Sequence, residues 1–335
     1  MPFAMMAIVA IVDVLAGPSV GYLPLLSLGP AFASLSASVR RTAAVGVLAL
    51  TLCTVLGLYD RVLGTRSNNL TFASISGVIA ASMLASAYRV RRERELADVR
   101  SVAEAAQRVL LRPVPRRVGP FRMAVRYVSA SAQATIGGDL YEVAMTPEAV
   151  RVIVGDVQGK GLDAVETAAV VLGAFREAAY DEPDLPGVTA RIEKALTRHL
   201  TSEQFVTAVL AELQDNGVTL LNRGHPAPLL VRPDGVVRTL DPPVAAPPLG
   251  LGALVDEPDS VHCLTMAPED QILFYTDGVV EARDSGGVFF PLLERAGVLA
   301  APDPETALDE LQDDLTRYVG GPIADDAAML LLRRR

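Results

Sequence analysis

Three observations predict a mixed α/β (α+β) domain at residues 119–335, preceded by a helical transmembrane region and a connecting helix. First, residues 1–88 hold only six charged side chains, so 26 of the 30 basic and 37 of the 39 acidic residues follow them. Second, residues 89–118 are dense in charge and show helical periodicity. Third, beyond Pro120, short apolar runs broken by Gly, Asp and Pro alternate with longer helical stretches.

The composition excludes several functional classes. The chain carries a net charge of −9, and the part after residue 88 carries −11, so it is a poor ligand for phosphate backbones and no nucleic-acid partner is expected. Cys53 and Cys263 cannot form a disulfide framework. Three histidines and two cysteines are too few to favour a zinc cluster.

Residues 1–88 predict about four membrane spans, at residues 4–16, 23–39, 43–58 and 70–88. A spanning helix needs about 20 apolar residues, so the fourth stretch fits best and the first is short. The second contains Pro24, Gly29 and Pro30, which favour a kinked or re-entrant segment. A buried core in a soluble protein is the alternative.

The charges beside these stretches predict their orientation. With four spans, the arginines at positions 40–41 and 89–94 lie on one side of the bilayer, and the positive-inside rule makes that side the cytoplasm. We therefore expect a multi-pass protein of the cell membrane with a cytoplasmic C-terminal domain. Asp13, in the first stretch, is either a functional residue within the lipid bilayer or a residue near a helix end.

Residues 89–118 form the predicted connector and linker. From Tyr88 to about Leu111, apolar residues recur at helical spacing, and no Pro or Gly occurs before Pro113. One helix is therefore expected to run out of the membrane. It is either a signalling helix that pairs in a homodimer or a solvated stalk, because barely three heptads are present.

The C-terminal domain is expected to contain seven strands and three helices. The strands are expected at Phe121–Ser129, Val150–Val157, Val206–Leu213, Val218–Leu221, Pro228–Val231, Gln271–Tyr275 and Met329–Leu332. The helices are expected at Leu162–Tyr180, Val188–Leu200 and Pro304–Val319. A domain of this size, roughly 215 residues, can bury a full core.

Four separate acids fall at strand ends or beside glycines: Asp139, Asp156, Asp277 and Asp325, the last followed by Asp326. Carboxylates are costly to cluster unless a cation neutralises them. Neighbouring glycines let the backbone approach closely, so that a carbonyl can join as a ligand. Together the four acids predict a site for Mg²⁺ or Mn²⁺ with oxygen ligands. Any one of them alone would as readily be a turn former or a helix cap.

A protein nucleophile is not indicated. The segment Gly155–Gly161 has three residues between its first two glycines and Gly after Lys160, whereas a phosphate-binding P-loop needs four residues and a Ser or Thr. His262-Cys263 lacks the following Arg of a cysteine-phosphatase loop, and no Gly-x-Ser-x-Gly elbow occurs. A metal-bound water is therefore the expected nucleophile.

Six motifs occur in a recognisable order: Ile136–Tyr141 (IGGDLY), Gly155–Gly161 (GDVQGKG), Asn222–Pro228 (NRGHPAP), Pro247–Gly250 (PPLG), Tyr275–Gly278 (YTDG) and Asp325-Asp326. Over residues 120–335 the chain resembles the SpoIIE/RsbU-like branch of the PPM-type (type 2C) metal-dependent serine/threonine protein phosphatases. The resemblance implies a four-layer αββα sandwich, two β-sheets flanked by helices, with the metal site at one end. The membrane half with Ala103–Arg108 is similar to multi-spanning regulators of this branch in high-GC Gram-positive actinobacteria.

The resemblance also implies roles for five residues. Asp156 would bridge two metal ions, with the carbonyl of Val157 as a further ligand. Asp277 and Asp325 would complete the shell of one ion, and Asp139 would bind a metal directly or through water. Two ions, Mn²⁺ or Mg²⁺, about 3.5–4 Å apart would polarise the phosphoryl group and supply hydroxide for in-line attack. Asp156 and Asp139 are accordingly the expected catalytic residues.

The sequence departs from the family pattern in two places. The usual Asp-Asp-x-Thr reads Asp325-Asp326-Ala327-Ala328, which is expected to loosen the surroundings of Asp325 without removing a ligand. The usual Asn-Ala-Gly-His segment reads Asn222-Arg223-Gly224-His225. His225 is either an acid near the leaving group or a residue that shapes the turn before Pro226. Arg223 contacts substrate phosphate or lies at the surface, and Lys160 lies near the site or in solvent.

The leading hypothesis is a membrane-anchored Mn²⁺/Mg²⁺-dependent protein-serine/threonine phosphatase, a phosphoric monoester hydrolase that acts in signal transduction. By resemblance, its partner and substrate is a small phosphorylated regulator, such as an anti-sigma factor antagonist with a STAS fold. The runner-up is a pseudophosphatase that binds the regulator at the membrane without turnover. A third interpretation is a metal-dependent hydrolase of a small phosphoester.

Overall fold

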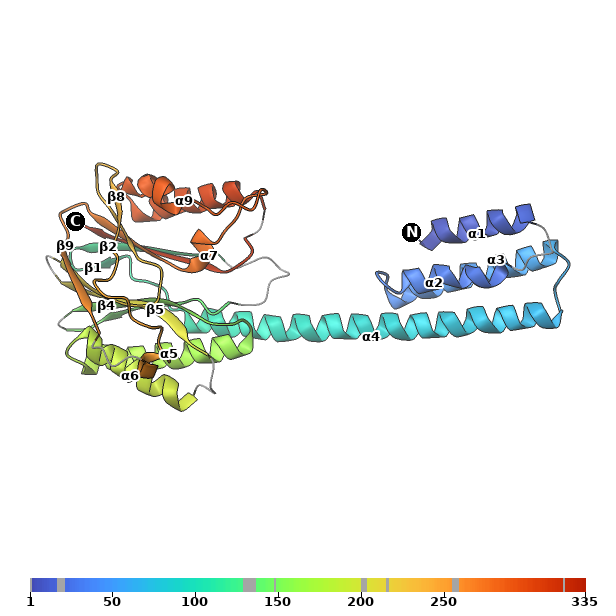
Figure 1. Cartoon of the computed structure of the whole chain (residues 1–335), viewed down its shortest axis with the longest axis horizontal. Helices are drawn as coiled ribbons and strands as arrows, with labels where there is room; N and C mark the ends of the chain where they lie inside the picture. Colours follow the sequence, from blue (N-terminus) through green and yellow to red (C-terminus); the bar gives the residue numbers. More distant parts are fainter. Residues whose placement is uncertain are drawn as a thin grey trace. The chain divides into compact units, whose positions relative to one another are not determined.

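The computed structural model describes residues 2–16, 22–128, 137–147, 149–199, 204–214, 217–254, 259–321 and 323–335. Two compact units divide the chain, Met1–Val99 and Arg100–Arg335. Figure 1 shows the helical N-terminal unit and the mixed C-terminal unit, and each is described by itself. Ser129, Ile136 and Leu200, which belong to predicted elements or motifs, lie outside the described residues.

The N-terminal unit is built only from helices in its described part: α1 (Pro2–Ala16), the 3₁₀ helix η1 (Leu23–Ser27), α2 (Leu28–Ala33), α3 (Val39–Tyr59) and the start of α4 (Arg66–Leu110). Apolar side chains such as Met6, Leu26, Ala49 and Ile75 form its core. The second predicted stretch, residues 23–39, is interrupted, because Pro24 lies in a 3₁₀ helix and α2 ends at Ala33.

Two helices of this unit are long and apolar enough to cross a bilayer. They are Val39–Tyr59 and the segment Arg66–Asp98 of α4, whose apolar stretches of 18 residues have mean hydropathies of 2.0 and 1.7, respectively. The helices Pro2–Ala16 and Leu23–Ala33 are apolar but shorter. Four spans therefore remain a prediction.

Helix α4 covers both the last apolar stretch and the charged connector. It runs without interruption from Arg66 to Leu110, a length of 45 residues, and ends shortly before Pro113. Leu96, Val102 and Val109 are exposed on it, so part of its apolar face is uncovered in the single chain.

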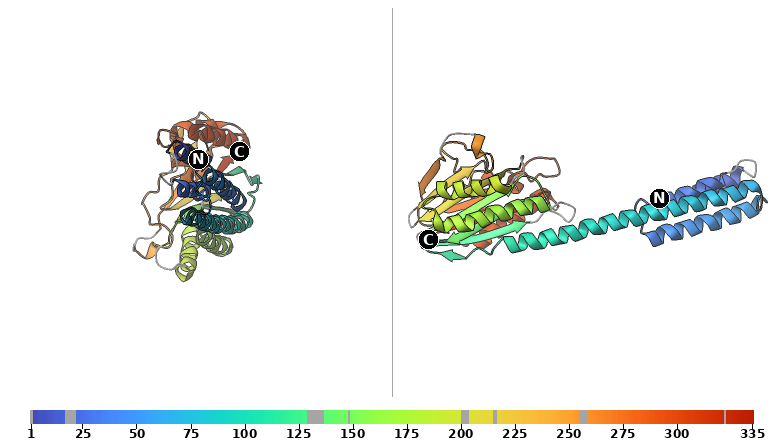
Figure 2. Two further views of the ribbon diagram at one scale, coloured as in Figure 1. Left: turned by 90° about the vertical axis from the view of Figure 1, so that its right-hand side faces the viewer. Right: turned by 90° about the horizontal axis from the view of Figure 1, so that it is seen from below.

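The C-terminal unit contains two antiparallel sheets. The six-stranded sheet has the order β1 (Arg117–Val118), β2 (Phe121–Val128), β11 (Ala327–Arg334), β10 (Gln271–Tyr275), β7 (Leu229–Val231) and β8 (Val237–Thr239). The five-stranded sheet has the order β3 (Leu140–Met145), β4 (Val150–Val157), β5 (Val206–Gln214), β6 (Gly217–Arg223) and β9 (Val261–Thr265). Figure 2 shows both from two further directions.

Helices cover the outer face of each sheet, which gives four layers. Helices α5 (Leu162–Asp181) and α6 (Leu185–His199) pack through Phe175 and Ile192 on the five-stranded sheet. Helix α9 (Pro304–Val319) packs through Leu308 and Leu311 on the six-stranded sheet, beside α8 (Leu292–Arg295) and η3 (Ala296–Ala300). A third core lies between the sheets. The four-layer αββα sandwich predicted from the resemblance is therefore confirmed.

The predicted strands and helices of this unit all occur, with ends that differ by at most three residues. Four strands were not predicted: β1, β3, β8 and β9. Strand β3 is buried on both faces for most of its length and so shows no alternation of apolar and polar residues. Strand β9 alternates between exposed and half-buried positions, but its sequence, Val-His-Cys-Leu-Thr, carries no clear apolar run.

Candidate metal centre and active site

Strand pairing brings the four predicted acids to one end of the two sheets. In the five-stranded sheet, Asp139 directly precedes β3, whose first residue, Leu140, pairs with Gly155 beside Asp156. In the six-stranded sheet, Asp277 follows β10 and Asp325 precedes β11, and these strands are antiparallel neighbours. The end of one strand and the start of its neighbour therefore meet at the same edge.

One carboxylate oxygen from each of Asp139, Asp156 and Asp277 lies within 4.8 Å of the others. Asp325 lines the same cavity, which has a volume of about 270 Å³. The rest of its described lining is supplied by Gly137, Gly138, Val157, Gln158, Gly159, Lys160, Phe205 and Thr207. Among the described residues, these acids are the only group of three or more His, Cys, Asp or Glu side chains placed to share a metal ion.

The charged form of these acids is disfavoured in the absence of a cation. Burial, followed by repulsion from Asp156, raises the pKa of Asp139 well above its ordinary value. Burial and repulsion from Asp277 raise the pKa of Asp156 to about 7. The pKa of Asp277 is raised by burial and by Glu281. Three carboxyl groups with raised pKa values in one cavity are the electrostatic signature of a cation site.

The donor set fits hard divalent cations. All four predicted side-chain ligands are carboxylates, which suit Mg²⁺ and Mn²⁺ better than softer metals. Two divalent ions would offset the negative charge of the four carboxylates. Val157 also lines the cavity, and a Cβ atom on Gly138 would stand 2.5 Å from its carbonyl oxygen. Glycine at position 138 is therefore required for this close approach.

A second glycine allows the two acidic segments to meet. A Cβ atom on Gly278 would stand 1.8 Å from the backbone oxygen of Asp326, a distance that no side chain tolerates. The short helix α7 (Asp277–Val280) can therefore begin against the Asp325-Asp326 segment only because position 278 is glycine.

Thr276 is a site residue that sequence reasoning missed. Its side chain is fully buried, and its Oγ1 donates a hydrogen bond to Asp139 Oδ2 at 2.7 Å while accepting one from the backbone N–H of Ala328 at 2.8 Å. The usual final motif has a threonine at position 328. Here the hydroxyl of Thr276, at the end of the neighbouring strand β10, lies beside that position instead. The only sequence signal was its position directly before Asp277.

A chain of hydrogen bonds supports the site from behind. Gln107 on α4 donates to Tyr127 Oη at 2.7 Å, and Tyr127 Oη donates to Asp326 Oδ2 at 2.5 Å. The same oxygen accepts the backbone N–H of Gly137 at 3.0 Å. Asp326 therefore fixes the segment that carries Asp325 against the segment that carries Asp139, and the last turns of α4 contact this arrangement. Sequence reasoning identified Asp326 only as the partner of Asp325 in the final motif.

The remaining predicted residues differ in their placement. Lys160 lines the cavity, and its Nζ lies 2.7 Å from Asp325 Oδ2. His225 lies behind the cavity, where Thr207 donates to its Nδ1 at 3.0 Å and its Nε2 donates to the carbonyl of Tyr275 at 3.0 Å. Burial lowers the pKa of His225 to about 4, so the ring is neutral at pH 7.

Arg223 is not brought into the cavity. It is buried and forms ion pairs with Glu193 on α6 at 2.5 Å and with Asp259 at 2.8 Å. Its guanidinium therefore ties α6 to the edge of the five-stranded sheet rather than facing the acids.

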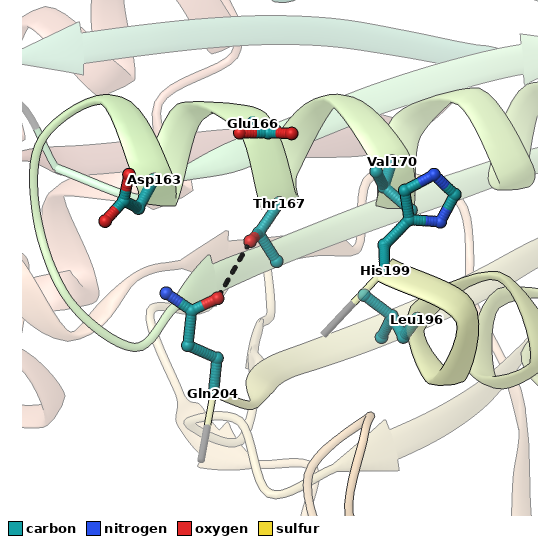
Figure 3. A pocket seen from close by; sticks show the side chains of 7 residues that line it. All are labelled: Asp163, Glu166, Thr167, Val170, Leu196, His199 and Gln204. Carbon is teal, nitrogen blue, oxygen red and sulfur yellow. Dashed lines mark hydrogen bonds between the residues drawn. The ribbon is translucent and has the colours of Figure 1, made fainter. Parts of the chain in front are cut away.

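A second cavity, of about 340 Å³, lies between α5 and α6 (Figure 3). It is lined by Asp163, Glu166, Thr167, Val170, Leu196, His199 and Gln204, and Thr167 donates to Gln204 Oε1 at 3.3 Å. Figure 3 shows Asp163 and Glu166 on one side and His199 on the other, so no metal-binding group converges among these described residues.

The two-sheet sandwich with this acidic cluster at one end is the phosphatase domain of the PPM type (type 2C). Solved structures with the same fold include the SiaA-PP2C domain of Pseudomonas aeruginosa, with 18% identity, 73% of this chain and 99% of that chain covered, and a TM-score of 0.61. Residues 146–335, more than half of the chain, match the family model described as Stage II sporulation protein E (SpoIIE). The chain belongs to the SpoIIE family.

Two other similar structures contain a further domain or a fragment of one beside the phosphatase domain. The RsbU and RsbW domains of a Mycobacterium tuberculosis protein show 26% identity and a TM-score of 0.55, with 65% of this chain and 61% of that chain covered. The phosphatase domain of SpoIIE from Bacillus subtilis, with a fragment of its regulatory domain, shows 18% identity and a TM-score of 0.54, with 65% of each chain covered. The chain thus spans less than two thirds of either.

Proposed function

We propose that this chain is a membrane-anchored, metal-dependent phosphoserine/phosphothreonine protein phosphatase with its catalytic domain in the cytoplasm. The convergence of Asp139, Asp156 and Asp277 within 4.8 Å, beside Asp325, carries the proposal. When bound there, two Mn²⁺ or Mg²⁺ ions supply Lewis acidity and an activated water.

The residues of the chain perform the remaining tasks. Asp156, Asp139 and the Val157 carbonyl would hold the ions from the five-stranded sheet, and Asp277 and Asp325 would hold them from the six-stranded sheet. Lys160 stands at the cavity wall and attracts the phosphoryl oxygens of the substrate by its charge. The neutral ring of His225 orients Thr207 at the cavity floor rather than donating a proton itself.

The shape of the site favours a protein substrate over a metabolite. The cavity holds about 270 Å³, enough for a phosphorylated side chain. Its described lining consists largely of glycines and charged residues, and Phe205 is the single aromatic side chain among them, so no pair of aromatic rings is present to bind a base or sugar. Because a similar structure contains RsbU and RsbW domains, we propose a small phosphorylated regulator of the anti-sigma factor antagonist type as the substrate.

The membrane location is supported by the two apolar helices Val39–Tyr59 and Arg66–Asp98 and by the arginines that follow the apolar part of the second. The connector would pass a signal to the catalytic domain. Its last turns contact that domain where Gln107 donates a hydrogen bond to Tyr127, which in turn donates to Asp326. The exposed Leu96, Val102 and Val109 would be the pairing face if the signal acts through a homodimer.

The alternative is an inactive binding module, which the alanine at position 328 favours. The hydrogen bonds of Thr276 argue against it, because they supply a hydroxyl between Asp139 and the Ala328 backbone. If this is right, Ala328→Thr will leave the rate of phosphate release within about twofold of wild type, since no missing contact is restored.

The deciding assay measures phosphate release from a phosphoserine regulator with Mn²⁺, Mg²⁺ or EDTA. The variant Asp156→Ala should lose activity, whereas the matched control Asp313→Ala, an exposed acid on α9, should keep it. Activity with EDTA, or full activity of Asp156→Ala, would reject the metal mechanism. Binding of the regulator without turnover would establish the inactive module, and turnover of a chromogenic phosphoester without turnover of the phosphoprotein would establish a small-phosphoester hydrolase.

A further inference from the structure

One end of the N-terminal unit contains two buried polar side chains and one half-buried acid among apolar helices. Asp13, three residues before the end of α1, is 1% exposed, and Asn68, in the first turn of α4, is 3% exposed. Asp60 directly follows α3. Helices α1 and α3 end, and α4 begins, at this end of the unit (Figure 1).

The two acids are neighbours. The carboxyl groups of Asp13 and Asp60 lie close enough to interact electrostatically, and the backbone of Tyr22 lies beside Asp13. Their outer oxygens, Asp13 Oδ2 and Asp60 Oδ1, are buried without a hydrogen-bond partner. Within the described part of the chain, no Lys or Arg side chain forms an ion pair with either acid, although Arg61 and Arg66 are close in sequence.

Asn68 supplies a further set of unsatisfied atoms at the same place. Neither its Oδ1 nor its Nδ2 has a hydrogen-bond partner. Both atoms lie 3.5 Å from the position that a Cβ on Gly57 would take, and Gly57 is one helical turn before Asp60 on the same face of α3. The side chain of Asn68 is therefore directed at the face of α3 that ends in Asp60.

Such an arrangement is costly unless something completes it. An unsatisfied buried polar atom destabilises the fold, and two neighbouring carboxylates cannot both be ionised in apolar surroundings without a cation between them. Ionisable residues that persist among membrane helices bind ions, substrates or protons as a rule. Two carboxylates and an amide oxygen are hard oxygen donors, and their charge matches a divalent ion that completes its shell with water.

We propose that Asp13, Asp60 and Asn68 form a second cation site, which binds a divalent ion of the Ca²⁺ or Mg²⁺ class and is separate from the catalytic centre. Its placement at the extracytoplasmic end of the membrane unit rests on the proposed function. The site joins the ends of α1 and α3 to the start of α4. A bound cation would therefore hold together three helices that otherwise contact one another through apolar packing. Asp60 is half-buried, which leaves the site a route to solvent.

The test measures Ca²⁺ binding to the full-length chain in lipid nanodiscs by isothermal titration calorimetry at pH 7. Asp13→Asn and Asp60→Asn, which keep side-chain volume, should each weaken one class of Ca²⁺ sites by roughly tenfold or more. Thr42→Val is the matched control, because Thr42 is buried with an unpaired hydroxyl at the opposite end of α3, and it should leave binding unchanged. Asp156→Asn should also retain this class of sites.

Identical isotherms for wild type, Asp13→Asn and Asp60→Asn would overturn the proposal. It also fails if wild type binds no Ca²⁺ beyond the catalytic site and infrared spectra show instead a protonated carboxyl band that Asp13→Asn removes. Circular dichroism checks that both variants keep their helices. Phosphate release is measured separately on the same preparations. If wild type releases no phosphate but binds Ca²⁺ at a site that Asp13→Asn removes, this inference is supported and only the proposed function is contradicted.

Discussion

Replacing Asp156 by Asn should stabilise the metal-free catalytic unit while destroying its response to metal. Folding raises the pKa of this carboxyl from 3.8 to about 7, through burial and repulsion from Asp277. A carboxyl group with a raised pKa favours the folded state below about pH 4 and loses that contribution as the pH rises towards 7. At about 1.4 kcal/mol per pH unit the full effect is about 4 kcal/mol. Because Asp139 and Asp277 share the repulsion and the cavity opens to water, we expect about 2 kcal/mol.

Thermal or urea unfolding of residues 100–335 at several pH values would measure this effect. In EDTA at pH 8, Asp156→Asn should melt roughly 4–8 °C above wild type, and the difference should vanish near pH 4. Mn²⁺ should stabilise wild type and barely affect the variant, whereas Asp313→Asn should follow wild type throughout. A variant less stable than wild type in EDTA at pH 8 would refute the reasoning, because the acids would then not be repelling one another.

Two further substitutions test the geometry. Gly138→Ala should abolish phosphate release, because its Cβ would stand 2.5 Å from the Val157 oxygen. The control Gly173→Ala, whose Cβ would meet no atom within 4 Å, should keep activity and raise the free energy of unfolding by about 0.5–1 kcal/mol. An active Gly138→Ala or an inactive Gly173→Ala would contradict the assignment. Tyr127→Phe removes the hydrogen bond to Asp326 and should weaken Mn²⁺ binding by roughly tenfold, measured by calorimetry on the folded variant; unchanged affinity would show that this contact does not position the metal ligands.

The sequence was informative where function imposes a local pattern. Strands such as β4 and β10 could be predicted to the residue, because in each an apolar run ends at or near an acid that lies beside a glycine. The same pattern predicted that Asp139, Asp156, Asp277 and Asp325 lie together. Which of them bind a metal, and how many ions, remain predictions.

Contacts between distant segments could not be predicted. Tyr127 and Asp326 are 199 residues apart, and nothing near Tyr127 in sequence indicates that its hydroxyl meets an acid. Arg223 lies within a recognisable motif, but a motif does not say which way a side chain points. Its ion pairs with Glu193 and Asp259, which are remote in sequence, turn it away from the cavity.

The position of β11 has a consequence for how the protein is made. This strand, formed by residues 327–334, lies between β2 and β10 in its sheet and follows Asp325, so neither the sheet nor the acidic cluster can close until these residues leave the ribosome. The N-terminal helices are synthesised more than 200 residues earlier. Under the proposed function, the N-terminal helices would therefore reach the membrane before the acidic cluster could form, and the order of translation would delay phosphatase activity until after anchoring.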